Sequence, residues 1–222
     1  PPAVIAPLYT YRMASPRAGA RSDAGVIGLV GLAHGTSHFF HLMLPPLFPW
    51  LMEDFSLGYT DVGLLTTVFF VISGVGQAMA GFVVDRVGAL RVLVFGVAML
   101  ALSGVMLGLS NSYAMLMLTA AVAGAGNSIF HPADFTLLNH RVSQPRLGHA
   151  FSVHGLSGNL GWAVAPVFMA GIASVAGWHV AGFGAAAVGA TVLTILWLRR
   201  HLLSDAAHEV VVARPASAPP PE

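Results

Sequence analysis

The sequence predicts an all-α membrane protein with six transmembrane helices, and three observations lead to this fold class. Hydrophobic residues make up 56% of the 222 residues and charged residues only 9%, whereas a soluble domain is typically about one quarter charged. Six apolar segments are each long enough to cross a hydrocarbon core of about 30 Å. The arginines fall in alternate connections. Because cysteine is absent, neither a disulfide framework nor a thiolate metal site is available.

The six expected spans follow one another with short connections. Turn-forming or polar stretches separate them, namely EDFSLGYTD, DRVGALR, SNS, NHRVSQPR and AGW in chain order. In the first span, Pro45, Pro46 and Pro49 are expected to bend the outer half of the helix. The spans are expected at residues 25–51, 61–84, 90–110, 112–138, 147–174 and 177–198.

The distribution of charge predicts the orientation. All ten basic residues are arginines, and six spans place every one of them on the same side of the membrane. Glu53, Asp54 and Asp61 fall on the opposite side. By the positive-inside rule, both termini are therefore cytoplasmic. The arginines are residues 12, 17, 21, 86, 91, 141, 146, 199, 200 and 214.

The remaining segments divide the chain into three parts. Residues 1–23 have no continuous apolar core and are expected to form a cytoplasmic tail. Residues 24–202 form the transmembrane domain. From residue 203 the chain is rich in proline, alanine and serine, so residues 203–222 are expected to be a disordered cytoplasmic tail or a linker to a second half.

Polar side chains inside the expected spans mark the candidate site. An ionisable group at membrane depth costs several kcal/mol unless it is paired or faces water. Three histidines of the first span, spaced by four and three residues, share one face of a helix. Proline breaks near them free carbonyls that need water or a ligand. The candidate cavity residues are His34, His38, His41, Asn127, His131, Asp134, His154 and Asn159.

Three interpretations of these residues remain open. Histidine titrates near neutrality, so His131 with Asp134 one helical turn away, aided by His38, could carry a proton. The same pair could instead brace the kinked end of the fourth span. A transition-metal path is the third interpretation, because His34 and His38 have the spacing of two ligands on one helix face and imidazole suits Zn, Cu or Ni.

Residues 81–91, GFVVDRVGALR, resemble the signature loop of the major facilitator superfamily, G-x-x-x-D-R-x-G-R-R/K. Gly81 would permit close helix contact, and Asp85 could face a helix N-terminus or pair with an arginine. Such a loop would favour one conformation of a rocking transporter. Positions 89 and 90 lack the usual basic residues. The loop residues are Gly81, Asp85, Arg86, Gly88 and Arg91.

A second resemblance points to the fosmidomycin-resistance branch of this superfamily. GAGNSIFHPADF is similar to that branch's His-Pro-acid triplet, with His131 and Pro132 matching and Asp134 one residue late. GLSGNLGWAVAP matches a second stretch through Asn159, and His38 stands where the branch often has an aspartate.

The resemblance implies half of a facilitator fold, built from two inverted three-helix repeats in which spans one and four line a cavity. It implies a proton-coupled antiporter of the inner membrane that exports a small organic compound. Transition-metal or organic-anion transport is the alternative, as is an inactive half that serves as an assembly partner. A second half is needed, either a missing C-terminal half or another copy in a homodimer.

No enzymatic function is expected, because the chain has no phosphate-binding loop and no convincing catalytic triad. No cofactor and no nucleic-acid partner are expected either. The expected partners are protons, a small-molecule substrate, the lipid bilayer and the second half.

Overall fold

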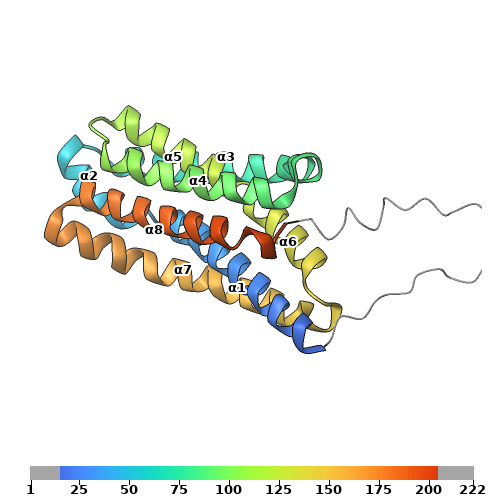
Figure 1. Cartoon of the computed structure of the whole chain (residues 1–222). Coiled ribbons are helices and arrows are strands. Elements are labelled where there is room, and N and C mark those ends of the chain that lie inside the picture. Colours follow the sequence, from blue (N-terminus) through green and yellow to red (C-terminus); the bar gives the residue numbers. More distant parts are fainter. Residues whose placement is uncertain (1–15, 205–222) are drawn as a thin grey trace, which may run out of the picture.

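The computed structural model describes residues 16–204, and every regular element in this range is helical (Figure 1). The all-α fold is therefore confirmed for the described part of the chain. Its long helices are α1 (Pro16–His41), α3 (Tyr59–Val87), α4 (Ala89–Gly108), α5 (Tyr113–Asn127), α6 (Phe130–Arg141), α7 (Leu147–Ala176) and α8 (Trp178–Leu198). The short ones are η1 (Pro45–Leu47), α2 (Phe48–Phe55), η2 (Gln144–Arg146) and η3 (Arg200–Leu202).

Within residues 16–204, five helical segments are long and apolar enough to cross a membrane. They are α3, α4, α5 with α6, η2 with α7, and α8. The expected first span at 25–51 is not among these five segments. Its histidines interrupt the apolar sequence, and its α-helix ends at His41. After a short link the chain continues as η1 and α2, which begin at or next to prolines.

The expected tails are described only in part. Helix α1 begins at Pro16, so the end of the predicted tail 1–23 is helical. Residues 1–15 and 205–222 lie outside the described residues, and with them most of the predicted tail or linker.

The fourth expected span, 112–138, is broken into α5 and α6 at Ser128 and Ile129. Pro132 explains the position of the break. It has no N–H to donate to the carbonyl of Ser128, four residues earlier, and its ring crowds that carbonyl. The helix restarts at Phe130, with Pro132 in its first turn. The break places Asn127 and His131 on opposite sides of a bend in the chain.

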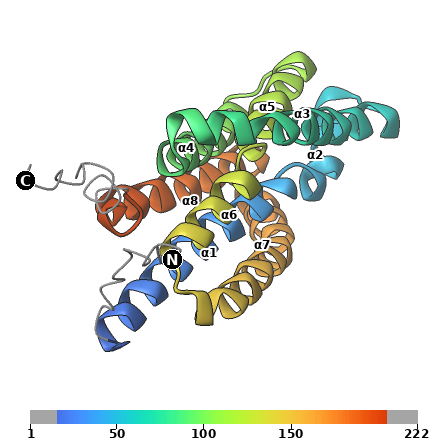
Figure 2. The same cartoon turned by 90° about the vertical axis from the view of Figure 1, so that its right-hand side faces the viewer.

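Glycines bring two pairs of helices into backbone contact. A Cβ atom on Gly104 of α4 would lie 2.5 Å from the backbone nitrogen of Ala186 in α8. A Cβ on Gly161 of α7 would overlap the carbonyl oxygen of Gly35 in α1. Small residues at such crossings let helices pack closely. Helices α1 and α7 therefore run against each other, with α6 also touching α1 (Figure 2).

The two ends of the bundle differ in charge, as the alternation of arginines predicted. The α3–α4 and α6–α7 connections, the start of α1 and the end of α8 share one end (Figure 1). There Arg146 forms an ion pair of 2.8 Å with the buried Asp23. At the other end, Trp178 Nε1 donates to Asp54 Oδ2 at 2.5 Å. The assignment of the arginine end to the cytoplasm stays a prediction.

Candidate functional site

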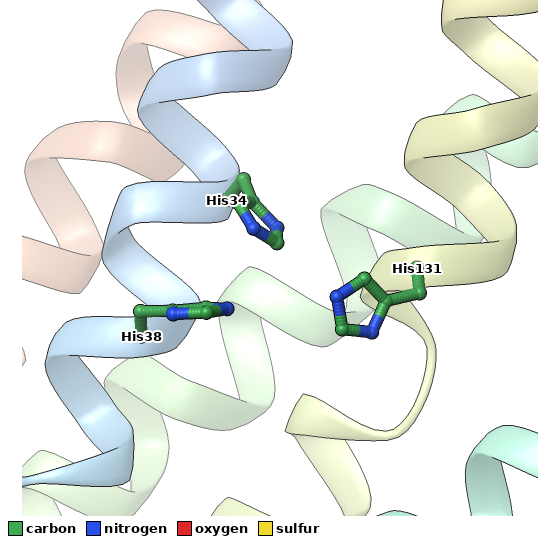
Figure 3. A group of neighbouring side chains, drawn as sticks. All are labelled: His34, His38 and His131. Atoms are coloured by element: carbon green, nitrogen blue, oxygen red, sulfur yellow. The ribbon is translucent and has the colours of Figure 1, made fainter. Parts of the chain in front are cut away.

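Histidines from three helices converge in the middle of the bundle, around one carboxylate. The four-residue and three-residue steps along α1 place its three histidines on one face. The ring centroids of His34 and His154 are 3.5 Å apart, and those of His34 and His38 are 4.4 Å apart. His131 of α6 approaches His34 at 5.3 Å between centroids. Figure 3 shows how His34, His38 and His131 point into one space. The cluster consists of His34, His38, His41, His131, His154 and Asp134.

Asp134 is the centre of the first hydrogen-bond network. Its side chain is fully buried, with 0% exposure. His34 Nδ1 and His154 Nε2 both donate to Asp134 Oδ2, each at 3.1 Å. A buried carboxylate needs a neutralising partner. One proton, either on Asp134 or as the second proton of one imidazole, would supply it. We call His34, Asp134 and His154 the proton triad.

The structure corrects the expected pairing of His131 with Asp134. Although one helical turn separates the two residues, Asp134 turns toward α1 and α7. His131 Nδ1 instead makes a 2.8 Å hydrogen bond with Gln77 Oε1 of α3. Because an amide oxygen only accepts, His131 carries its proton on Nδ1 in this arrangement.

His41 belongs to a separate chain of hydrogen bonds. Trp162 Nε1 of α7 donates to His41 Nδ1 at 3.1 Å. Since an indole N–H only donates, His41 Nδ1 must hold a lone pair. His41 Nε2 then donates to Asn127 Oδ1 at 2.9 Å, and Asn127 Nδ2 donates to Ser73 Oγ at 2.7 Å. This chain keeps His41 in its neutral form.

His38 lies between the two networks without a hydrogen bond of its own. Both of its ring nitrogens are buried and have no protein partner. Its ring is 4.5 Å from the Trp162 ring and 4.6 Å from the His41 ring, measured between centroids. Gly158 of α7 makes room for it, because a Cβ there would lie 2.8 Å from the His38 ring. An unsatisfied buried polar group costs about 1–3 kcal/mol, so the two nitrogens of His38 retain unused hydrogen-bonding capacity.

Seven of the eight predicted cavity residues thus come together, and one does not. Asn159 is exposed on α7, and none of the hydrogen bonds described within residues 16–204 joins it to the cluster. Sequence reasoning missed Gln77 and Trp162, which fix the tautomers of two histidines. It also missed Ser73, which accepts a hydrogen bond from Asn127. Gln77 left one signal, since it interrupts an apolar span. The exposed Trp162 gave none.

The predicted conformational loop lies at the arginine end, between α3 and α4. Gly88 has a φ of +95°, which only glycine adopts readily. Asp85 is exposed and lines a cavity of about 240 Å³ with residues of α6. Arg86 and Arg91 are also exposed. The expected role of Gly81 in close helix contact is wrong for this domain, because a Cβ there would meet nothing within 4 Å.

The fold and the site define a multi-pass helical membrane protein that encloses a polar, titratable centre. Residues 30–219 match the family model of the Major Facilitator Superfamily, and the chain belongs to this family. The family predicted from the loop and the histidine motif is therefore confirmed. Its members are transporters, and on this ground the chain belongs to a transporter family and is not an enzyme.

Individual relatives agree with this assignment. The chain is 30% identical over 175 residues to the fosmidomycin resistance protein of Escherichia coli (strain K12). The aligned region covers 78% of this chain and 43% of that protein. It is 30% identical over 167 residues to a probable 4-methylmuconolactone transporter of Cupriavidus pinatubonensis, covering 73% of this chain and 38% of the relative. The chain spans less than half the length of these curated relatives.

Among solved structures, the fold is similar to that of a peptide transporter, a mutant of POT in complex with sulfate. The TM-score is 0.62 at 16% identity, over 84% of this chain and 42% of that one. At this level of identity the similarity concerns the fold alone.

Proposed function

We propose that residues 24–202 form one six-helix half of a secondary transporter in the inner membrane. The transporter exports a small organic compound in exchange for protons. The observation that carries the proposal is the fully buried Asp134, held between His34 of α1 and His154 of α7. We further propose that α1 also crosses the membrane, which brings the number of spans to six. In this arrangement α1 and α5–α6 are the first helices of two inverted repeats.

The proton triad suits proton coupling because its three members belong to three helices. With one proton, the triad is neutral overall and stable in a buried place. A second proton leaves a net positive charge, which favours contact with water. When α1, α6 and α7 move relative to one another, the two hydrogen bonds to Asp134 change. The affinity of the triad for its second proton then changes with the conformation, which is the requirement for coupling.

The substrate contacts the open side of the cluster in this proposal. His38, His41 and His131 are only partly buried. Aromatic side chains border them, and Phe70, Phe135 and Trp162 are 47%, 43% and 42% exposed. A small organic compound can pack on these rings, and a movement of the rings would bring it to the unpartnered nitrogens of His38, which are buried in this conformation. Fosmidomycin is the first compound to test, because one relative is named for resistance to it.

The same open side calls for a second half. A polar cluster facing lipid would be costly, and the relatives are more than twice as long as the matched region. We propose that a C-terminal half or a second copy of this chain covers the cluster. The native mass of the purified chain, in mild detergent and in nanodiscs, distinguishes the two: a stable dimer supports two identical halves, and a monomer supports a separate C-terminal half.

The test of coupling uses the assembled transporter in proteoliposomes with an imposed pH gradient. Wild-type protein is expected to move fosmidomycin in exchange for protons, driven by the pH gradient. Asp134→Asn is expected to abolish that movement. His179→Ala, at an exposed residue outside the cluster, serves as the matched control and should transport normally. Undiminished pH-driven transport by Asp134→Asn would contradict the proposal. No movement by wild type would favour an inactive half that acts as an assembly partner.

A further inference from the structure

We propose that His34, His38 and His131 form a binding site for a divalent transition-metal ion such as Zn²⁺. One ring nitrogen from each residue lies within 4.8 Å of the other two. Figure 3 shows the three rings directed into the space between α1 and α6, with ring nitrogens of His38 and His131 turned toward each other. We call these residues the three-histidine site. Its existence is independent of the substrate proposed above.

The hydrogen bonds leave the right nitrogens available. His34 donates through Nδ1 to Asp134 Oδ2, and His131 donates through Nδ1 to Gln77 Oε1. In a neutral imidazole the other nitrogen, Nε2, then holds a lone pair. When His34 is neutral and donates to Asp134, two of the three residues are therefore in the tautomer that can bind a metal ion through Nε2.

The same partners form the outer shell that metal sites use. Metal-binding histidines almost always donate their second ring N–H to a carboxylate, a carbonyl or water, which fixes the ring and raises its basicity. Asp134 has this role for His34 and Gln77 has it for His131. His34 and His131 therefore each already have, on α6 and α3, the second partner that a metal site requires.

His38 supplies an independent indication. It is the third member of the site, and both of its buried ring nitrogens lack a protein partner. A metal ion would satisfy one of them, whereas no side chain in the described residues does. The open side of the site, where His38 and His131 are partly exposed, leaves a fourth ligand position for water or an anion, as zinc sites with three protein ligands have.

The geometry requires a modest closure. Zn–N bonds of about 2.0–2.1 Å in a tetrahedral site place the nitrogens about 3.4 Å apart. The three nitrogens now lie within 4.8 Å of one another, so they must approach by at most about 1.4 Å. Two ligands come from α1 and one from α6, so an ion would draw these helices together.

A second group, the proton triad, also has metal-ligand composition, but its arrangement differs. Asp134 Oδ2 already accepts hydrogen bonds from both His34 and His154, so an ion at Oδ2 would have to displace both hydrogen bonds. Asp134 Oδ1 is buried without a partner. The two groups share His34, which uses Nδ1 for the triad and Nε2 for the metal. A bound ion would occupy the lone pair that accepts a second proton, so metal and protons compete at this residue.

The test is titration of the purified chain in mild detergent, after removal of any affinity tag, with Zn²⁺ by calorimetry and Co²⁺ by visible absorption. We expect one ion per chain and the intense absorption of tetrahedral Co²⁺. His38→Ala breaks no hydrogen bond and should weaken binding at least 100-fold. Gln77→Ala should weaken it by about 10–100-fold through loss of the outer shell, and Gln77→Glu should restore it.

The controls are His149→Ala and His179→Ala, at exposed histidines outside the cluster, which should bind as wild type does. Absence of saturable binding to the wild-type chain would overturn the proposal. Equal binding by wild type and His38→Ala would also overturn it. Binding that survives His38→Ala but is lost in His154→Ala would place the ion at the proton triad and would contradict the three-histidine site.

Discussion

Replacement of Asp134 separates its structural role from its proposed role in proton coupling. In Asp134→Ala, the imidazoles of His34 and His154 each lose the acceptor that now lies 3.1 Å away. Each unsatisfied buried donor costs about 1–3 kcal/mol. The variant should therefore lose about 2–6 kcal/mol of stability, and its unfolding temperature should fall on the order of 10 °C.

Asp134→Asn has nearly the same shape and should behave differently. With its side-chain oxygen in the place of Oδ2, it accepts hydrogen bonds from both imidazoles as Asp134 does, and its NH₂ group takes the place of Oδ1, which has no partner. We expect a loss of about 1 kcal/mol. The amide binds no proton, so pH-driven transport should be lost although the protein stays folded.

The assay is thermal unfolding in detergent, followed by tryptophan fluorescence, together with transport in proteoliposomes. We expect the unfolding temperature of wild type to be slightly above that of Asp134→Asn and far above that of Asp134→Ala. If the asparagine variant unfolds as early as the alanine variant, the charge of Asp134 has a structural role that the hydrogen-bond argument omits. If the alanine variant is as stable as wild type, the buried network contributes nothing and the argument is refuted.

Three further predictions concern the frame of the site. Gly104→Val should destabilise the domain by about 1–3 kcal/mol, because its Cβ would collide with the α8 backbone, whereas Gly171→Val, where a Cβ meets nothing within 4 Å, should change the unfolding temperature little. Trp162→Phe should leave the fold intact but release His41 Nδ1, so the ¹⁵N NMR spectrum of that histidine should show a mixture of tautomers; an unchanged spectrum would contradict the proposed chain. Asp23→Ala should cost about 1–2 kcal/mol by removing the 2.8 Å ion pair with the arginine at the start of α7, and equal melting of both proteins in detergent would count against it.

Much of the fold could be predicted because the bilayer restricts the choices. Apolar length fixes where helices lie, and the arginine distribution fixes which ends lie together. The helical stripe of His34, His38 and His41 followed from spacing alone, and the structure confirms that they share one face. Of the six expected spans, only the first is not apolar enough to be recognised as a membrane-crossing helix. The histidines that contribute to the site lower its hydropathy.

The pairings inside the site could not be predicted, because they depend on how each helix rotates about its axis. His131 and Asp134 are one turn apart, yet they bond to partners on other helices, Gln77 for the first and His34 for the second. Pro132 indicates the break before α6. The sequence does not indicate how this break changes the direction of the side chains that follow it. The contribution of Trp162 depends on the contact between α1 and α7, which only a three-dimensional structure shows.

Proton binding by the triad can be measured without any membrane gradient. The assembled transporter, in lightly buffered detergent solution with a pH indicator, is mixed with a compound that it carries, while quenching of tryptophan fluorescence reports binding. We predict that wild type releases or takes up about one proton per bound molecule, because a change in the contacts of Asp134 alters the affinity of the triad for protons, and that Asp134→Asn binds the compound with no such exchange. Equal proton exchange by both proteins would contradict the proposal that this triad couples transport to protons.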